Sequence, residues 1–285
     1  MQKHSLSFEA IGTSWQIETD VPMSPQLTQA IFKRIEAFDK TYSRFRADSL
    51  VSQIAKKEGI YTFPDDATQL FEFYKKIYDV TNGKVTPLIG GMLEKAGYDA
   101  NYSFVESAQT RLPLWDEAFQ WSGNILKVHT PVTLDVGAAG KGYLIDLVCG
   151  LLDGEGIASY VVDVSGDMRH KGMAENKVGL EDPYDPSRVI GAIDVLDKSI
   201  CASATNRRTW GNGVHHIFDP DLMESTQEIT ATWVIADTAM AADGLATALF
   251  FVDPNVLRKQ FNFEFLRVHR DGAIDYSPAF EGRLF

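Results

Sequence analysis

The sequence predicts an α+β fold that forms one domain over residues 1–285. Helix-type spacing of apolar residues prevails before Trp115, and short β-rich runs prevail after it. No repeat, low-complexity tract or flexible linker divides the chain. With 45% hydrophobic residues, a chain of 285 residues can bury a substantial core. We therefore expect a helix-rich N-terminal part and a strand-rich C-terminal part.

The chain is expected to begin with extended structure followed by a helix. Residues 8–18 alternate imperfectly between polar and apolar, which predicts a strand or a hairpin arm around Gly12. Ser24 and Pro25 open a helix, because a capping residue followed by proline suits a helix start. The apolar face of this helix comprises Leu27, Ile31, Ile35 and Phe38.

Two further helices are expected in the helix-rich part. Asp48 is placed to cap a short helix through Ile54, and residues 64–66 start a longer helix that ends before Gly83. The inward residues of the longer helix are Leu70, Phe71, Tyr74, Ile77 and Tyr78, which we read as core.

The strand-rich part contains two helical segments among several short strands. The helices are expected over residues 142–152 and 238–252. The β-rich runs are residues 125–129, 133–136, 160–164, 189–196 and 229–235.

Composition excludes several classes of partner. A net charge of −12 and a pI near 4.9 argue against nucleic-acid or anionic-membrane binding through bulk electrostatics. No apolar run has the length of a membrane span, and the first ten residues carry neither an apolar signal region nor a lipid-acceptor cysteine. A cytoplasmic location is therefore expected, and an exported protein whose signal has been removed is the alternative. Cys149 and Cys201 lack a paired spacing and are read as buried thiols.

Residues 133–147 predict a phosphate-binding turn. A buried strand is expected to end on Asp135, and a glycine-rich turn then leads through Lys141 into a helix. Helix-start amides and a lysine suit an anion. The alternative is a tight turn with a solvated lysine. The spacing does not match a P-loop, because Gly142 follows the lysine where Ser or Thr is needed.

Asp243 and Thr247 share one face of the late, otherwise apolar helix. A carboxylate in such surroundings needs a partner, because an isolated buried charge is costly. Together with a backbone carbonyl, the two side chains could hold Mg²⁺. The alternative is a hydrogen bond between Asp243 and Thr247.

Adjacent histidines, His215 and His216, precede an Asp-Pro turn. Neighbouring residues on a strand face opposite ways, so at most one is expected to point into a given site. Histidine is a natural general base near neutral pH. Two loop histidines without a role are the alternative, and zinc is disfavoured because no further ligand pattern accompanies them.

Three segments combine short strands or helices with turn residues and could form loops of a site. They are residues 42–49, 162–169 and 178–183. In the first, Phe45 could stack on a planar ring, and arginines nearby could meet anions. Each segment alone could be a surface turn.

Taken in order, these motifs resemble the ApbE family, the FAD:protein FMN transferases once regarded as thiamine-biosynthesis lipoproteins. The resemblance runs from residue 11 to the helix that carries Asp243. The matching motifs are residues 134–137 with Lys141 and Gly142, Ser165-Gly166-Asp167, residues 179–183, residues 216–220 and residues 242–248.

The resemblance implies a T-fold-like ApbE architecture that binds FAD and Mg²⁺. The reaction would move the FMN half of FAD to a Thr or Ser hydroxyl of an acceptor flavoprotein and release AMP. Mg²⁺ would lie between the carbonyl of Ala138 and the side chains of Asp243 and Thr247, and His216 would act as base beside them. The residues that would contact FAD are Ile11, Phe45, Lys84, Val85, Thr86, Asp135, Lys141 and Ile217.

The chain departs from the family pattern at several positions. Thr86 stands where an aspartate is usual, Ile11 stands where methionine is common, and residues 202–205 replace the usual Thr-Ser-Gly-Asp. Two other functions therefore stay open. The protein could hydrolyse FAD to FMN and AMP with water as acceptor, or it could be a non-catalytic FAD-binding carrier.

Overall fold

The computed structural model describes residues 4–172, 174–211, 213–280 and 283–285. The chain divides into two compact units, each built from separate stretches of sequence. The first unit comprises residues 1–36, 139–206 and 227–285, and the second comprises residues 37–138 and 207–226. The boundary falls within the helix α1 (Pro25–Tyr42). The expectation that residues 1–285 form a single domain stays a prediction.

The first unit is an eight-stranded sheet in which every paired strand runs antiparallel to its neighbour. The strand order is β1 (His4–Ala10), β2 (Thr13–Thr19), β6 (Tyr160–Val164), β7 (Asp167–Lys171), β10 (Ser199–Ala204), β15 (Ile229–Ala236), β16 (Glu264–His269) and β17 (Ile274–Tyr276).

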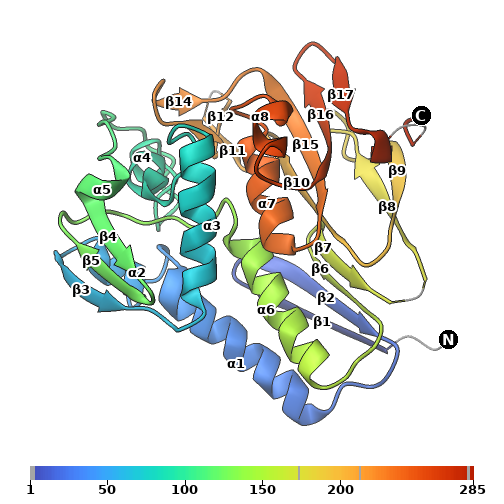
Figure 1. Cartoon of the computed structure of the whole chain (residues 1–285). Coiled ribbons are helices and arrows are strands. Elements are labelled where there is room, and N and C mark those ends of the chain that lie inside the picture. The colour runs from blue at the N-terminus through green and yellow to red at the C-terminus, as the bar shows by residue number, and fades with distance from the viewer. Residues whose placement is uncertain (1–3, 173, 212, 281–282) are drawn as a thin grey trace. The chain divides into compact units, whose positions relative to one another are not determined.

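Opposite faces of this sheet carry different layers. The helices α6 (Gly140–Gly154) and α7 (Ala239–Ala248) pack against each other at their N-terminal turns, and α7 packs on β10 and β15 (Figure 1). On β15 the Thr232 hydroxyl donates to the carbonyl of Ala246 in α7, while Trp233 belongs to a separate apolar cluster. Alternation along one strand thus divides its side chains between the two faces.

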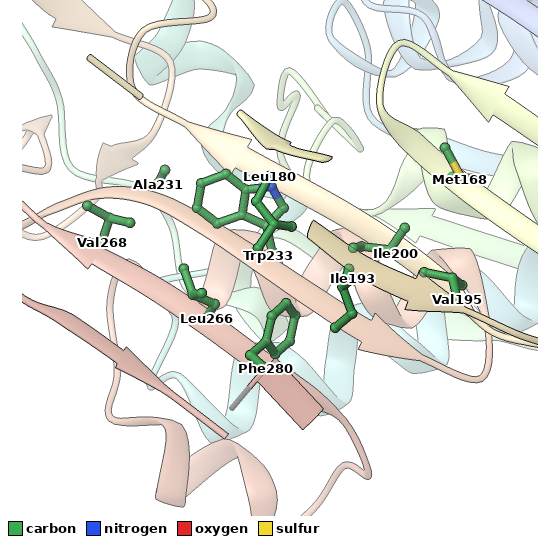
Figure 2. Packing of buried hydrophobic residues seen from close by; sticks show 10 residues of the cluster. All are labelled: Met168, Leu180, Ile193, Val195, Ile200, Ala231, Trp233, Leu266, Val268 and Phe280. Atoms are coloured by element: carbon green, nitrogen blue, oxygen red, sulfur yellow. The ribbon is translucent and has the colours of Figure 1, made fainter. Parts of the chain in front are cut away.

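The hairpin of β8 (Asn176–Glu181) and β9 (Val189–Val195) covers the face of the sheet away from α7. Leu180 of β8 and Ile193 of β9 pack with Trp233 and Leu266 of the sheet and with Phe280 of the short helix η2 (Pro278–Phe280) (Figure 2). The helix α8 (Pro254–Arg258) precedes β16. The described part of the first unit therefore combines a central sheet, a helical layer and a covering hairpin.

The second unit combines short helices with a three-stranded sheet in the order β3-β5-β4. The ring of Trp121 stacks on Phe71 at 3.9 Å between centroids and forms part of its core. The elements are α2 (Leu50–Ile54), β3 (Gly59–Thr62), α3 (Ala67–Val80), η1 (Pro87–Ile89), α4 (Gly90–Lys95), α5 (Trp115–Ala118), β4 (Phe119–Ser122), β5 (Ile125–Val128), and the ribbons β11 (Thr209–Trp210) with β12 (Val214–His215) and β13 (Phe218–Asp219) with β14 (Glu224–Ser225).

Most predicted elements are confirmed, and two are wrong. Ser49, rather than the exposed Asp48, caps α2, because the Ser49 hydroxyl accepts from Ser52 N at 3.1 Å while Asp48 pairs with Arg46. Residues 133–136 form no strand in the described structure, since their backbone finds no strand to pair with and Asp135 N donates to Pro87 O at 2.8 Å. The expected hairpin around Gly12, both long N-terminal helices and the two later helices are present.

The predicted burial of both cysteines is confirmed, since Cys149 and Cys201 are buried free thiols. Among the described residues, no helix is long and apolar enough to cross a bilayer.

Candidate active site

In the first unit, α7 presents the carboxylate predicted to bind a metal ion. The Thr238 hydroxyl accepts from Ala241 N and caps this helix. Asp243 is only 5% exposed, and its Oδ2 accepts from Gly142 N of α6 at 2.9 Å. Thr247 lies one turn further along and is half-buried. Within the described part of the chain, its hydroxyl makes no hydrogen bond, so Asp243 and Thr247 are not bonded to each other.

The approach of α6 to α7 depends on the absence of a side chain at Gly142. A Cβ atom there would lie 2.1 Å from the Ala239 carbonyl oxygen and 2.8 Å from the Cβ of Asp243. Real side chains do not tolerate such distances, so only glycine permits this packing. The family motif around Lys141 and Gly142 thus has a steric reason.

Asp146 fastens the start of α7 to α6. Its Oδ1 accepts from Ala239 N at 2.9 Å and its Oδ2 accepts from Met240 N at 2.8 Å. Burial raises the pKa of Asp146 to about 6, although both amides and Arg169 lower it. Sequence analysis missed this residue. The cost of burying a carboxylate, which pointed to Asp243, applies equally to Asp146 in the largely apolar helix α6.

Lys141 pairs with a carboxylate of the central sheet. Its Nζ lies 2.7 Å from Oδ2 of Asp167, which is 1% exposed, and the other oxygen of Asp167 accepts from Ala202 N at 3.0 Å. Burial lowers the pKa of Lys141, but Asp167 and Asp243 outweigh it and raise that pKa above its ordinary value. Lys141 therefore carries a positive charge at neutral pH, held beside the first turn of α6.

In the second unit, Asp135 is held by a buried arginine. Arg44 Nε donates to Oδ2 of Asp135 at 2.6 Å, and Arg44 Nη1 donates to the carbonyl oxygen of Tyr98 at 2.8 Å. The other Asp135 oxygen accepts from Gly137 N at 2.6 Å. Burial raises the pKa of Asp135, but Arg44 and the Gly137 amide outweigh it and hold the pKa below its usual range. Asp135 is therefore an oriented anion.

Lys84 is tied to the turn that follows the histidine pair. Its Nζ lies 2.7 and 2.9 Å from the two oxygens of Asp219 and 2.8 Å from Oδ2 of Asp221. Neighbouring Val85 and Thr86 are buried. The Thr86 hydroxyl accepts from Leu88 N at 3.2 Å and caps η1. These ion pairs hold the turn at Asp219 and Asp221, which follows His216 in the sequence, against Lys84.

The two histidines have different surroundings. His215 Nε2 lies 2.9 Å from the carbonyl oxygen of Thr226, and its Nδ1 accepts from Ile217 N at 3.3 Å, so both ring nitrogens are used. His216 follows the end of β12, and among the described residues its enclosed Nδ1 has no hydrogen-bond partner. Burial, with Arg208 and His215, lowers the pKa of His216 to about 3, against the attraction of Asp135. His216 is therefore neutral at pH 7.

The predicted site residues are distributed over both units. Lys141, Asp243 and Thr247 come together around the start of α6 and along α7 in the first unit, and Ile11 lies in the turn between β1 and β2 of that unit. Those of the second unit are Phe45, Lys84, Val85, Thr86, Asp135, Ala138, His216 and Ile217.

No group of three or more His, Cys, Asp or Glu side chains suited to a metal occurs within the described residues. Hydroxyl oxygens are metal donors as well, and Thr247 supplies one a helical turn from Asp243. The oxygen donors Asp243 and Thr247 fit a hard cation such as Mg²⁺. Arg44, Asp167 and Asp219 lie in segments that the sequence singled out, but their pairing with Asp135, Lys141 and Lys84 was not predicted.

Comparison with known proteins assigns the chain to a family. A model of the ApbE family matches residues 11–265. The chain is 23% identical to the FAD:protein FMN transferase of Escherichia coli (strain K12), over 98% of this chain and 85% of that protein. It is 25% identical to the protein of the same name from Klebsiella pneumoniae (strain 342), over 90% of this chain and 81% of that one.

Solved structures share the fold. The ApbE protein of Thermotoga maritima superposes with a TM-score of 0.87 at 23% identity, covering 100% of both chains. The flavin transferase ApbE of Vibrio cholerae superposes with a TM-score of 0.82 at 20% identity, covering 99% of both chains. The predicted α+β architecture of the ApbE type is thereby confirmed. The chain belongs to the ApbE family and is an enzyme of the transferase class.

Proposed function

We propose that the protein transfers the FMN moiety of FAD to a Thr or Ser hydroxyl of an acceptor flavoprotein, with release of AMP and dependence on Mg²⁺. The observation that carries the proposal is the buried carboxylate of Asp243, held by Gly142 N one helical turn from the Thr247 hydroxyl. A carboxylate oxygen and a hydroxyl oxygen one turn apart are donors that suit a hard divalent cation such as Mg²⁺. The names of the relatives support the flavin as substrate.

Asp243 and Thr247 would hold Mg²⁺ through their side chains, with the carbonyl of Ala138 as the further ligand implied by the family resemblance. When bound, Mg²⁺ would neutralise charge on the diphosphate of the substrate. Lys141 would contribute a second positive charge, because Asp167 fixes its ammonium group and keeps it protonated. The FAD contacts proposed for the remaining residues follow from the same resemblance: Ile11, Phe45, Lys84, Val85, Thr86, Asp135 and Ile217.

His216 is the proposed general base. Its low pKa leaves the imidazole unprotonated at neutral pH, and no described group uses its Nδ1. As the acceptor oxygen attacks the phosphorus of the FMN phosphate, its proton would pass to the imidazole of His216. The bond from that phosphorus to the AMP oxygen would break, and AMP would leave with the bonding electrons.

The test separates transfer from its two alternatives. The protein is incubated with FAD and Mg²⁺, with and without a flavin-acceptor domain, and flavin fluorescence of the acceptor in a denaturing gel and AMP are both measured. Transfer predicts a fluorescent acceptor and an equal amount of AMP only when acceptor is present. AMP without acceptor labelling would identify a hydrolase, and FAD binding without either product would identify a carrier. The last two outcomes each contradict the proposal.

A further inference from the structure

An aromatic cluster in the second unit surrounds Phe45, the residue predicted to stack on a planar ring. The Tyr102 ring lies parallel to the Phe45 ring, at 5.5 Å between centroids and 4° between planes. Tyr98 stacks on Trp210 at 5.5 Å, and Phe104 stacks on Trp210 at 5.9 Å. We call Phe45, Tyr98, Tyr102, Phe104 and Trp210 the aromatic cluster.

Within this cluster Phe45 is firmly placed. The Arg44 guanidinium lies 4.2 Å from the centroid of the Phe45 ring, and Arg44 is itself anchored by Asp135 and the carbonyl of Tyr98. A cation against an aromatic face adds to the stacking energy of that ring. Phe45 is thus a fixed apolar surface.

Tyr102, by contrast, is held by weak contacts. It is 51% exposed, and its hydroxyl makes no hydrogen bond within the described structure. Its backbone has a φ of 50°, in the left-handed region that a bulky residue adopts only at a cost, and Phe104 two residues on has a φ of 52°. Ring contacts with the cluster, and one bond from Tyr102 N to Asp99 O at 3.1 Å, therefore oppose local backbone strain.

We propose that Tyr102 and a planar ring of the flavin nucleotide compete for the same face of Phe45. The inference rests on the proposed function, because it takes FAD as the ligand. A parallel ring at stacking distance from Phe45 is the contact that an isoalloxazine or adenine ring would make. Tyr102 thereby sets the affinity and the association rate of FAD, since only molecules with Tyr102 displaced accept the ring.

The size of the effect follows from the stack that must be broken. The stack of Tyr102 on Phe45 stabilises the closed arrangement, in which FAD cannot reach the Phe45 ring. A stack of this kind reduces the fraction of molecules that can bind FAD by about 2- to 10-fold. Tyr102→Ala removes the competing ring, so we expect FAD to bind about 2- to 10-fold more tightly, mainly through faster association. Tyr102→Leu should act the same way, and it keeps apolar bulk in the loop if the alanine variant folds poorly.

The experiment measures FAD binding by quenching of flavin fluorescence, in titrations and in stopped flow, with Mg²⁺ present and acceptor withheld so that no transfer occurs. Tyr102→Phe is the matched control, because it keeps the stack and loses only the hydroxyl, and it should bind FAD as the wild type does. Val105→Ala is the loop control, because Val105 is 69% exposed and has no ring. It should also leave FAD affinity unchanged.

FAD binding that is unchanged or weaker in both Tyr102→Ala and Tyr102→Leu would overturn the proposed competition. Weaker binding would mean that Tyr102 is itself part of the surface that binds FAD. AMP release by the wild type with Mg²⁺ and acceptor tests the proposed function separately. Normal AMP release with unchanged affinity in the variants refutes only the competition. Tighter FAD binding by the variants without AMP release or acceptor labelling refutes only the transferase. A wild type that binds no FAD refutes both.

Discussion

Gly142→Ala should separate α6 from α7 and displace the carboxylate on which the proposed function depends. The new Cβ would lie 2.1 Å from the Ala239 carbonyl oxygen, whereas an ordinary contact begins near 3.4 Å, so the helices must move apart by about 1.3 Å. That movement lengthens the bond from Gly142 N to Oδ2 of Asp243, now 2.9 Å.

The free energy of unfolding should fall by about 2–5 kcal/mol. Overpacking costs about 1–3 kcal/mol, and losing a hydrogen bond to a charged group costs about 1.5–3 kcal/mol. The better helix propensity of alanine returns about 1 kcal/mol. Gly150→Ala is the matched control in the same helix, because a Cβ there meets nothing within 4 Å. That variant should be more stable than the wild type by about 0.5–1 kcal/mol.

Urea unfolding gives the stability of both variants, and AMP release in the presence of FAD, Mg²⁺ and acceptor gives their activity. Gly142→Ala should lose stability and AMP release together, while Gly150→Ala keeps full activity. A Gly142→Ala protein as stable and as active as Gly150→Ala would show that the close approach of the two helices is not needed, and the steric argument would be wrong.

Five further predictions concern titratable groups of the site. Asp243→Asn keeps the shape of the side chain but removes its charge. AMP release should fall by about 10²-fold or more, which is the scale of losing one electrostatic stabiliser of a transition state. Full AMP release by this variant, or by the wild type in excess chelator, would exclude the metal. His216→Ala should lower the rate of FMN transfer by about 10²–10⁴-fold while the variant still binds FAD. Because the pKa of His216 is about 3, protonation of this residue should not lower the wild-type rate between pH 5 and 8. His215→Ala should instead lower stability by about 1–3 kcal/mol, because Ile217 N and Thr226 O lose their partner, and a larger loss of transfer than in His216→Ala would reverse the two roles. Lys141→Ala should weaken FAD binding measured by fluorescence titration, and an unchanged affinity would remove Lys141 from the phosphate site. The raised pKa of Asp146 means that the folded protein holds the proton more tightly than the unfolded chain, so the stabilisation is complete below about pH 4 and is lost as pH rises through 6. The free energy of unfolding of the wild type, relative to that of Asp146→Asn, should therefore fall by about 1–3 kcal/mol between pH 4 and 7. A difference between the two proteins that stays constant with pH would refute the raised pKa.

Local patterns predicted the elements whose causes are local. The helix α1 follows from its cap and proline, since Leu27 N donates to the Ser24 hydroxyl at 3.1 Å. The helix α7 likewise begins after its capping residue Thr238. The apolar residues of α1 face inward as their spacing predicts, and Leu27, Ile31, Ile35 and Phe38 are buried.

The errors arise where distant partners decide the structure. Residues 133–136 have strand-like composition, but Asp135 is held by Arg44 and Pro87, which lie far away in the sequence. The roles of Asp146 and Asp167 likewise depend on amides of α7 and β10 that no local pattern identifies. A single sequence shows that a buried carboxylate needs a partner, but it does not show which one.

The structure also gives a reason why two departures from the family pattern can be harmless. Ala202 donates its main-chain amide to Asp167, and every residue except proline supplies that amide, so a different side chain at this position keeps the hydrogen bond that supports the partner of Lys141. Thr86 caps η1 through its hydroxyl, a role that an aspartate could also fill. Replacing aspartate by Thr86 therefore preserves the cap and removes one negative charge from the unit that holds Lys84. Since Lys84 is already paired with Asp219 and Asp221, its position does not depend on a carboxylate at residue 86. The charge that distinguishes this chain from the usual family pattern would then affect the affinity for FAD more than the fold.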